Sequence, residues 1–327
     1  MKADRILVRA PNWIGDAVLS LGAVRDLRRN FPASRIEVLA RPWVADLYGA
    51  VAEVDAVRRT TAFRPDAAAL RGAFDAALLL PNSFGTALQV FAAGIPERWG
   101  YATDGRGMLL TRRARVPRAA LRGSSEVYYY RAMLAALGFE VSATADVSLR
   151  PPAAWGARGA EILGDGGPWI GVSAGASFGS AKQWIAARFA AVADRLHRST
   201  GARVAILGGA AERPRGEAIA ATLSAPSRLL CGATTLPELI GVLSRLSLFL
   251  TNDSGPMHLA SAQGVPVVAV FGPTDWRETA PVGSAHRVVR AEVECAPCKL
   301  RECPIDHRCM TGVGVDAVAA AALELLR

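Results

Sequence analysis

A strand, a polar turn and the start of a helix follow one another in Leu250-Thr251-Asn252-Asp253-Ser254-Gly255-Pro256-Met257-His258-Leu259-Ala260. The apolar residues before the turn predict a buried strand, and Asp253 or Ser254 is a suitable helix N-cap. Pro256 fits the first helical turn, and Gly255 lets a ligand approach the backbone. An ordinary capped helix has the same features. The alternative is a diphosphate site, because free amides and the positive end of a helix dipole attract anions.

Strands and helices alternate on both sides of this stretch. In the second half, strands are expected at Trp169–Ala174, Arg203–Gly208, Leu248–Thr251 and Val265–Phe271, and helices at Ala186–Ser199, Leu236–Leu246 and Pro256–Gln263. In the first half, strands are expected at Arg5–Ala10, Arg35–Ala40 and Phe74–Leu80, and helices at Asp16–Asn30 and Ser125–Leu137. Near-continuous apolar strands are typical of parallel sheets covered on both faces. The predicted fold class is α/β, with two Rossmann-like, doubly wound parallel-sheet domains.

Proline and glycine gather between the two halves. Residues 151–167 begin with two prolines and end in Gly164-Asp165-Gly166-Gly167, a composition typical of a linker. We therefore expect an N-terminal domain over 1–150 and a C-terminal domain over 168–327, and a length of 327 residues suits two cores. Because ligands bind at the carboxyl ends of parallel strands, we expect the active site in a central cleft that both domains face.

The composition is that of a globular protein, with 51% hydrophobic and 20% charged residues. Its apolar runs, such as Val265–Phe271, are far shorter than the roughly 18 residues that cross a bilayer. The N-terminus leads from Met1 directly into an expected strand, without the apolar segment and cleavage site of a signal peptide. We therefore expect a cytoplasmic protein without a transmembrane helix.

The net charge of +9 is uneven along the chain. Residues 1–150 contain 21 Lys and Arg against 14 Asp and Glu, a net +7, whereas the remaining residues contain 17 against 15, a net +2. This excess of positive charge has two interpretations. It reflects the preference of a GC-rich genome for arginine over lysine, or it attracts an anionic partner such as a membrane surface or a phosphorylated glycolipid. We set nucleic acid aside, because the arginines between Arg98 and Arg122 lack the interleaved aromatics of a single-strand binder.

A second loop of small residues connects a strand to a helix in Ser173-Ala174-Gly175-Ala176-Ser177-Phe178-Gly179-Ser180-Ala181-Lys182-Gln183-Trp184. It resembles a phosphate-binding loop without the Walker A order, so ATP hydrolysis of that kind is not implied. Lys182 is either a point charge against a diphosphate leaving group or a solvated lysine at a helix start.

The third candidate lies near the N-terminus, where a strand leads through Pro11-Asn12-Trp13-Ile14-Gly15 into a helix with Asp16 in its first turn. An aspartate at this position commonly does no more than complement the helix dipole. If Asp16 faces the cleft, it can accept a proton from an incoming hydroxyl group.

Four cysteines are spaced C-x2-C-x4-C-x5-C at Cys295, Cys298, Cys303 and Cys309, with His307 among them. In a cytosolic protein this spacing favours a metal or free thiols over disulfides. A structural zinc bound by all four cysteines, or by three and the histidine, is one interpretation; reduced thiols or a redox pair is the other.

Three motifs in this order resemble glycosyltransferase family nine, the lipopolysaccharide heptosyltransferases, over nearly the whole chain. They are Pro11 to Asp16, Gly175 to Trp184, and Thr251 to His258 with Phe271-Gly272-Pro273-Thr274-Asp275. The stretch Cys231 to Leu236 and the cysteine segment also resemble the family, especially its heptosyltransferase II branch. Ile185 departs from the pattern, since a proline is common there.

The resemblance implies a GT-B architecture in which the N-terminal domain binds the acceptor and the C-terminal domain binds ADP-L-glycero-β-D-manno-heptose. Heptose is transferred to the inner core of lipopolysaccharide with inversion of the anomeric centre. The implied catalytic residues are Asp16, as general base, and Lys182. The implied donor-binding residues are Ser177, Lys182, Glu212, Asp253, Ser254, Gly255 and His258, and Glu212 contacts the ribose. No cofactor is implied for catalysis, because Lys182 and a helix terminus stabilise the leaving charge.

The implied partners are the ADP-heptose donor, a lipid-linked core oligosaccharide and, peripherally, the inner leaflet of the inner membrane. Other functions remain as alternatives: a GT-B transferase for another nucleotide sugar, an epimerase of similar form, or a catalytically silent protein that binds a sugar nucleotide or a glycolipid. A silent protein is disfavoured because it would lose the base, whereas Asp16 is present.

Overall fold

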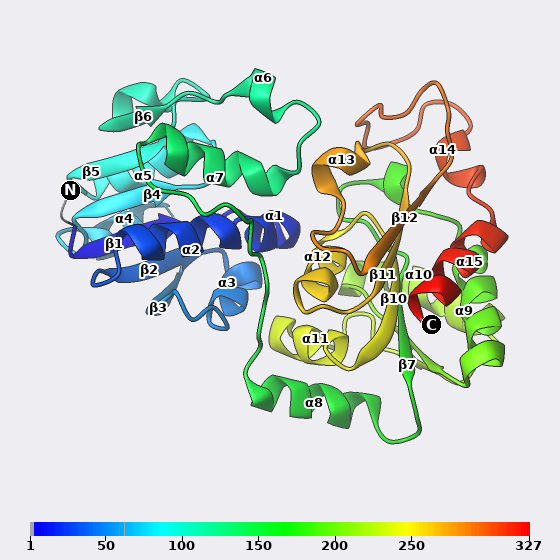
Figure 1. Ribbon diagram of the computed structural model, residues 1–327. Coiled ribbons are helices and arrows are strands. Elements are labelled where there is room, and N and C mark those ends of the chain that lie inside the picture. Colours follow the sequence, from blue (N-terminus) through cyan, green and yellow to red (C-terminus); the bar gives the residue numbers. More distant parts are fainter. Residues whose placement is uncertain (1–2, 62) are drawn as a thin grey trace. The chain divides into compact units, whose positions relative to one another are not determined.

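The structure is a computed structural model that describes residues 3–61 and 63–327. The chain divides into two compact units, Met1–Val147 and Ser148–Arg327 (Figure 1). Each unit has its own parallel sheet. No helix of the described residues is both long enough and apolar enough to cross a membrane.

Unit 1 contains a six-stranded sheet with the order β3-β2-β1-β4-β5-β6, in which every neighbouring pair is parallel. Its strands are β1 Arg5–Arg9, β2 Arg35–Ala40, β3 Ala56–Arg59, β4 Ala76–Leu79, β5 Glu97–Tyr101 and β6 Arg112–Ala114. Its helices are α1 Ile14–Leu19, α2 Leu21–Asn30, α3 Pro42–Tyr48, α4 Phe63–Leu70, α5 Phe84–Ala92, η1 Arg106–Leu109, α6 Arg118–Leu121 and α7 Glu126–Ala136. The helix expected over Asp16–Asn30 is thus two helices. Ser20 lies between them, and its hydroxyl donates to the Ala17 carbonyl at 2.8 Å, a bond that commonly bends a helix.

Unit 2 contains a second six-stranded parallel sheet with the order β12-β11-β10-β7-β8-β9. Its strands are β7 Trp169–Ser173, β8 Arg203–Ile206, β9 Ser227–Leu229, β10 Leu246–Asn252, β11 Val267–Phe271 and β12 His286–Arg290. Its helices are α8 Ala153–Leu163, η2 Ser180–Lys182, α9 Ala186–Thr200, η3 Ala210–Glu212, α10 Arg213–Thr222, α11 Leu236–Leu243, α12 Gly255–Ala262, α13 Trp276–Thr279, α14 Arg308–Thr311 and α15 Val315–Leu325. Counted from its own first strand, this sheet repeats the order of unit 1, which is the doubly wound Rossmann order. The predicted α/β class is confirmed.

Helices cover both faces of the second sheet, as Figure 1 shows. On one face α9 packs against α10 and α15, and on the other α11 packs against α8 and α12. Residues 151–167, the stretch with linker composition, therefore contain a helix that packs on unit 2. Glycines allow this close approach, because a Cβ on Gly159 would lie 2.2 Å from the Gly241 carbonyl.

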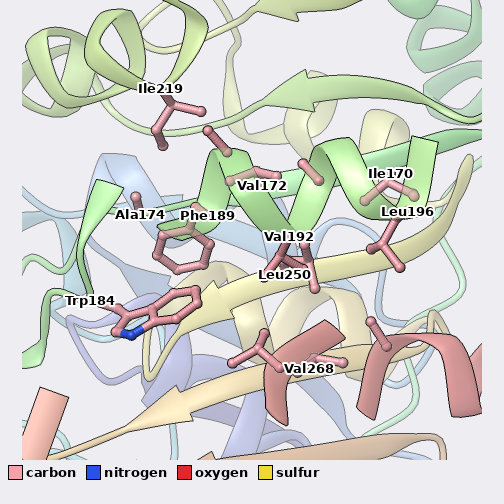
Figure 2. Close-up of a cluster of buried hydrophobic side chains, with 14 of the residues drawn as sticks. Ile170, Val172, Ala174, Trp184, Phe189, Val192, Leu196, Ile219, Leu250 and Val268 are labelled. Carbon is pink, nitrogen blue, oxygen red and sulfur yellow. The ribbon is translucent and has the colours of Figure 1, made fainter. Parts of the chain in front are cut away.

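The core of unit 2 lies between its sheet and the helices α9, α10 and α15 (Figure 2). Trp184 is fully buried there, and its ring meets the Phe189 ring edge to face with centroids 4.8 Å apart. Its indole N–H donates to the Val313 carbonyl at 3.1 Å. Trp184 therefore anchors the end of the loop that follows β7.

Candidate active site

Two loops of unit 2 leave the neighbouring strands β7 and β10, where the strand order reverses. The first loop, residues 174–183, carries η2, and the second leads directly into α12. In doubly wound sheets this is where ligands bind. Ser177 is exposed on the first loop, and Phe178 is half-buried beside it. The fold thus brings together the two segments that the sequence suggests as diphosphate sites.

An ion pair joins the two loops. Lys182 Nζ lies 2.6 Å from Asp253 Oδ2, and the two side chains are 11% and 5% exposed. The same oxygen accepts hydrogen bonds from the hydroxyls of Thr274 at 2.7 Å and Thr279 at 3.3 Å. The Lys182 ammonium also lies 4.8 Å from the centroid of the Phe178 ring. Burial and these partners fix the position of the lysine charge, so Lys182 is no solvated helix-start residue.

Asn252, at the end of β10, holds both ends of the first loop. Its side-chain oxygen accepts the Trp184 backbone N–H at 3.0 Å. Its amide group donates to the carbonyls of Ala174 at 2.8 Å and Gly175 at 3.2 Å. The Asn252 side chain is fully buried, so water does not compete for these hydrogen bonds. Sequence reasoning gives this residue no role, although it belongs to the quoted strand–turn–helix stretch.

The helix α12 begins at Gly255 with Ser254 at its N-cap position and Pro256 in its first turn. The Ser254 side chain does not cap the helix; its hydroxyl lies 3.0 Å from the Thr251 hydroxyl instead. The first-turn amides of α12 therefore receive no side-chain cap, and this end of the helix suits an anion. His258 is buried one turn further on, and burial lowers its pKa to about 4. The imidazole is therefore neutral at physiological pH.

Glu212 ends η3 and packs against the first loop. Its Oε2 accepts the Gly209 N–H at 2.7 Å. A Cβ on Gly175 would lie 1.7 Å from Glu212 Oε1, so a larger residue there would displace the Glu212 carboxylate. The fold thus places this carboxylate beside the same loop as Lys182.

The cysteine segment, residues 295–309, also contacts the first loop, at Ala181. The Ala181 N–H donates to the Arg301 carbonyl at 3.0 Å, and His307 Nε2 lies 2.7 Å from the Ala181 carbonyl oxygen. Both backbone groups of the residue before Lys182 are thus held by this segment. Nothing in the sequence pattern predicts the contact.

The structural zinc site, one of the two interpretations of the cysteine spacing, is not supported. All five cysteines are free thiols, and the four of the cysteine segment line a cavity of about 70 Å³. Within the described residues, however, no group of three or more His, Cys, Asp or Glu side chains is arranged to hold a metal ion. Instead, His307 Nε2 contacts the Ala181 carbonyl oxygen, and the His307 backbone N–H donates to Cys303 Sγ at 3.3 Å.

Asp16 belongs to unit 1 and lies half-buried in the first turn of α1, after β1. The preceding loop is fixed by two side chains: Arg9 donates to the Asn12 side-chain oxygen at 3.0 Å, and the Trp43 indole donates to the Asn12 carbonyl at 2.7 Å. Burial, reinforced by the nearby Asp16 charge, raises the pKa of Tyr130. The Asp16 carboxylate therefore lies close to a buried phenol at the carboxyl end of the first sheet.

Residues 67–308 match the family described as glycosyltransferase family 9 (heptosyltransferase). The chain belongs to glycosyltransferase family 9. This family 9 member is therefore a glycosyltransferase, and its two doubly wound units are those of the GT-B fold. The predictions of family, fold and enzyme class are confirmed.

Three similar proteins illustrate the relationship. Lipooligosaccharide heptosyltransferase 2 of Haemophilus influenzae is 30% identical over 87% of this chain and 88% of its own length. Lipopolysaccharide heptosyltransferase 2 of Escherichia coli is 30% identical over 88% of each protein. The solved structure of E. coli ADP-heptose LPS heptosyltransferase II superimposes with a TM-score of 0.84 at 28% identity and covers 98% of both chains.

Proposed function

We propose that this family 9 glycosyltransferase moves heptose from ADP-L-glycero-β-D-manno-heptose to the inner core of lipopolysaccharide, with inversion of the anomeric centre. The names of the similar proteins supply the substrate class: two are heptosyltransferases 2, and one name includes ADP-heptose. In this proposal residues 1–150 bind the acceptor and residues 168–327 bind the donor.

The observation that carries the proposal is the Lys182–Asp253 pair beside the start of α12. When the bond between the anomeric carbon and the diphosphate breaks, ADP leaves with the electron pair. An ammonium group and a helix N-terminus placed in advance stabilise that charge without reorganising. Ser177, Ser254 and Gly255 are proposed to complete the phosphate site, and the reaction then needs no divalent ion.

The proposed general base is Asp16. Its carboxylate accepts the proton of the acceptor hydroxyl while that oxygen attacks the anomeric carbon from the side opposite the leaving ADP. The base and the leaving-group site then belong to different units of the chain. Glu212 is proposed to bind the ribose hydroxyls, and the neutral His258 to border the donor pocket.

We also propose that the enzyme meets its acceptor at the membrane surface. A lipid-linked core oligosaccharide is presented at the inner leaflet, and the excess of basic residues in residues 1–150 suits a cytoplasmic enzyme that binds this surface peripherally.

Mass spectrometry of products tests the proposed function. The chain is incubated with ADP-heptose and truncated core acceptors, and in parallel with other nucleotide sugars. A product heavier by one heptose, formed only from ADP-heptose and formed far more slowly by the Asp16→Asn variant, is the expected result. Transfer of another sugar would favour the related GT-B transferase, and binding without turnover would favour the silent sugar-nucleotide or glycolipid binder.

A further inference from the structure

The charge at the donor site is not balanced by Lys182 alone. Its ammonium lies 2.6 Å from the buried Asp253 carboxylate, so the charges of the pair largely cancel. A diphosphate carries at least two negative charges in its complex, and it requires further positive charge within hydrogen-bonding reach. This argument rests on the proposed function, in which a nucleoside diphosphate leaves from this site.

The cysteine segment brings a second cation to the same aromatic ring. The Arg301 guanidinium carbon lies 5.5 Å from the centroid of the Phe178 ring, and Lys182 Nζ lies 4.8 Å from it. The backbone of Arg301 is fixed to the loop, since its carbonyl accepts the Ala181 N–H at 3.0 Å. A Cβ on Gly179 would lie 2.2 Å from that carbonyl oxygen, so the loop has a glycine where the segment crosses it.

Arg301 differs from the other arginine of the segment in its partners. Arg308 forms an ion pair with Asp306 at 3.0 Å, whereas Arg301 is exposed and forms no ion pair with any residue that the structure describes. Its charge is therefore available to a ligand. The Phe178 ring orients the guanidinium, which presents paired donors that match phosphate oxygens.

We propose that Arg301 is a second diphosphate-binding cation of the donor site. It supplies the net positive charge that the Lys182–Asp253 pair lacks, and it binds the β-phosphate group of a nucleoside diphosphate, which AMP does not have. The cysteine segment then acts as the support that carries this arginine to the loop after β7.

Calorimetric titration of the full chain with ADP and with AMP tests the proposal. Arg301→Gln should weaken ADP binding by about tenfold, because a charge-assisted hydrogen bond to phosphate is lost. AMP binding should change by less than about twofold, which also shows that the variant is folded. Arg301→Lys should retain part of the ADP affinity, and the difference between wild type and Arg301→Gln should shrink at high salt. Arg308→Gln, which removes a paired charge from the same segment, is the matched control and should bind ADP like the wild type.

Two results would overturn the inference. An Arg301→Gln variant that binds ADP as tightly as the wild type, or that loses ADP and AMP affinity equally, rules out a β-phosphate contact while the proposed donor stands. A wild-type chain that binds neither nucleotide rules out the proposed donor, and the Arg301 inference with it.

Discussion

The Lys182 ammonium and the Asp253 carboxylate meet at 2.6 Å across two loops that leave neighbouring strands of the second sheet. Hydroxyls of Thr274 and Thr279 reach the same Asp253 oxygen. The carboxylate therefore positions the lysine as well as neutralising it. Removing either partner leaves the other as an unpaired charge in a site with little access to water.

Lys182→Ala should lower kcat/KM for the donor by about 10²–10³, because the cation proposed to stabilise the leaving diphosphate is lost. The variant should also unfold at lower urea concentration, since Asp253 keeps a buried charge without its partner. Steady-state kinetics and urea denaturation measure the two effects. Lys299→Ala is the matched control, because Lys299 pairs with Glu278 at an exposed position, and its kinetics should stay near wild type. An unchanged rate at saturating donor would leave Lys182 a binding role only.

Asp16→Asn should lower turnover by about 10²–10⁴ and leave ADP affinity nearly intact, because the amide cannot take the acceptor proton. Single-turnover kinetics and ADP titration separate the two effects. Asp46→Asn changes a carboxylate of the same unit that pairs with Arg59, and it should retain wild-type turnover. Near-normal turnover of Asp16→Asn would remove Asp16 from the mechanism.

The buried His258 should make unit 2 less stable in mild acid. Burial lowers its pKa to about 4 in the folded protein, whereas an unfolded histidine titrates near 6.5. Between these values the unfolded chain binds the additional proton, so stability falls as the pH decreases. The loss between about pH 7 and pH 5 should be about 2 kcal/mol. Urea midpoints followed by tryptophan fluorescence measure it. His258→Gln should show a shallower loss than the wild type; an identical pH dependence in the two proteins would contradict the assignment.

Catalysis should persist in excess EDTA, because in the proposed mechanism Lys182 and the start of α12 stabilise the leaving diphosphate in place of a divalent ion. Turnover is measured on protein dialysed against the chelator, with and without added Mg²⁺. Equal rates are expected. Loss of activity that Mg²⁺ restores would refute the metal-independent mechanism.

Peripheral membrane binding should depend on exposed arginines of unit 1. A variant with neutralised arginines tests this. Arg112 is left unchanged in it, because Arg112 hydrogen-bonds to the Leu137 carbonyl and lies 5.1 Å from the Phe139 ring centroid. The variant instead neutralises four exposed residues: Arg113, Arg115, Arg118 and Arg122. Each contributes about 1 kcal/mol at an anionic surface, and salt screens this attraction. Sedimentation with anionic liposomes at low ionic strength should therefore fall in the variant.

The control for this experiment neutralises four exposed arginines of unit 2: Arg195, Arg198, Arg213 and Arg245. Its sedimentation should match the wild type. Equal binding of wild-type protein to anionic and neutral liposomes would mean that the arginine excess reflects composition alone.

The sequence pattern predicts the central strands well and the outer strands poorly. β1 and β10 are buried along most of their length and appear as apolar runs. The strands β6, β9 and β12 are edge strands, carry arginine and are partly exposed, so they show no such run. Their pairing depends on neighbours that are distant in the sequence.

The residues of the candidate site also divide into those that local sequence predicts and those that it does not. Asp253, Ser254 and Lys182 lie in loops with recognisable local chemistry, so sequence reasoning finds them. Asn252 and Arg301 act through contacts with residues far along the chain, at Trp184 and Phe178, and local pattern holds no information on such pairs.

The cysteine segment, which hydrogen-bonds to Ala181, carries native thiols to which a fluorescent label can be attached. Burial raises the pKa of Cys231 and Cys309 to about 11, so both remain protonated and unreactive, whereas Cys295 and Cys298 are exposed. A maleimide dye should therefore attach within the cysteine segment, at exposed Cys295 and Cys298 ahead of half-buried Cys303. Since Arg301 and His307 connect that segment to the residue beside Lys182, the proposed nucleotide binding should change the fluorescence of a label there without any mutation.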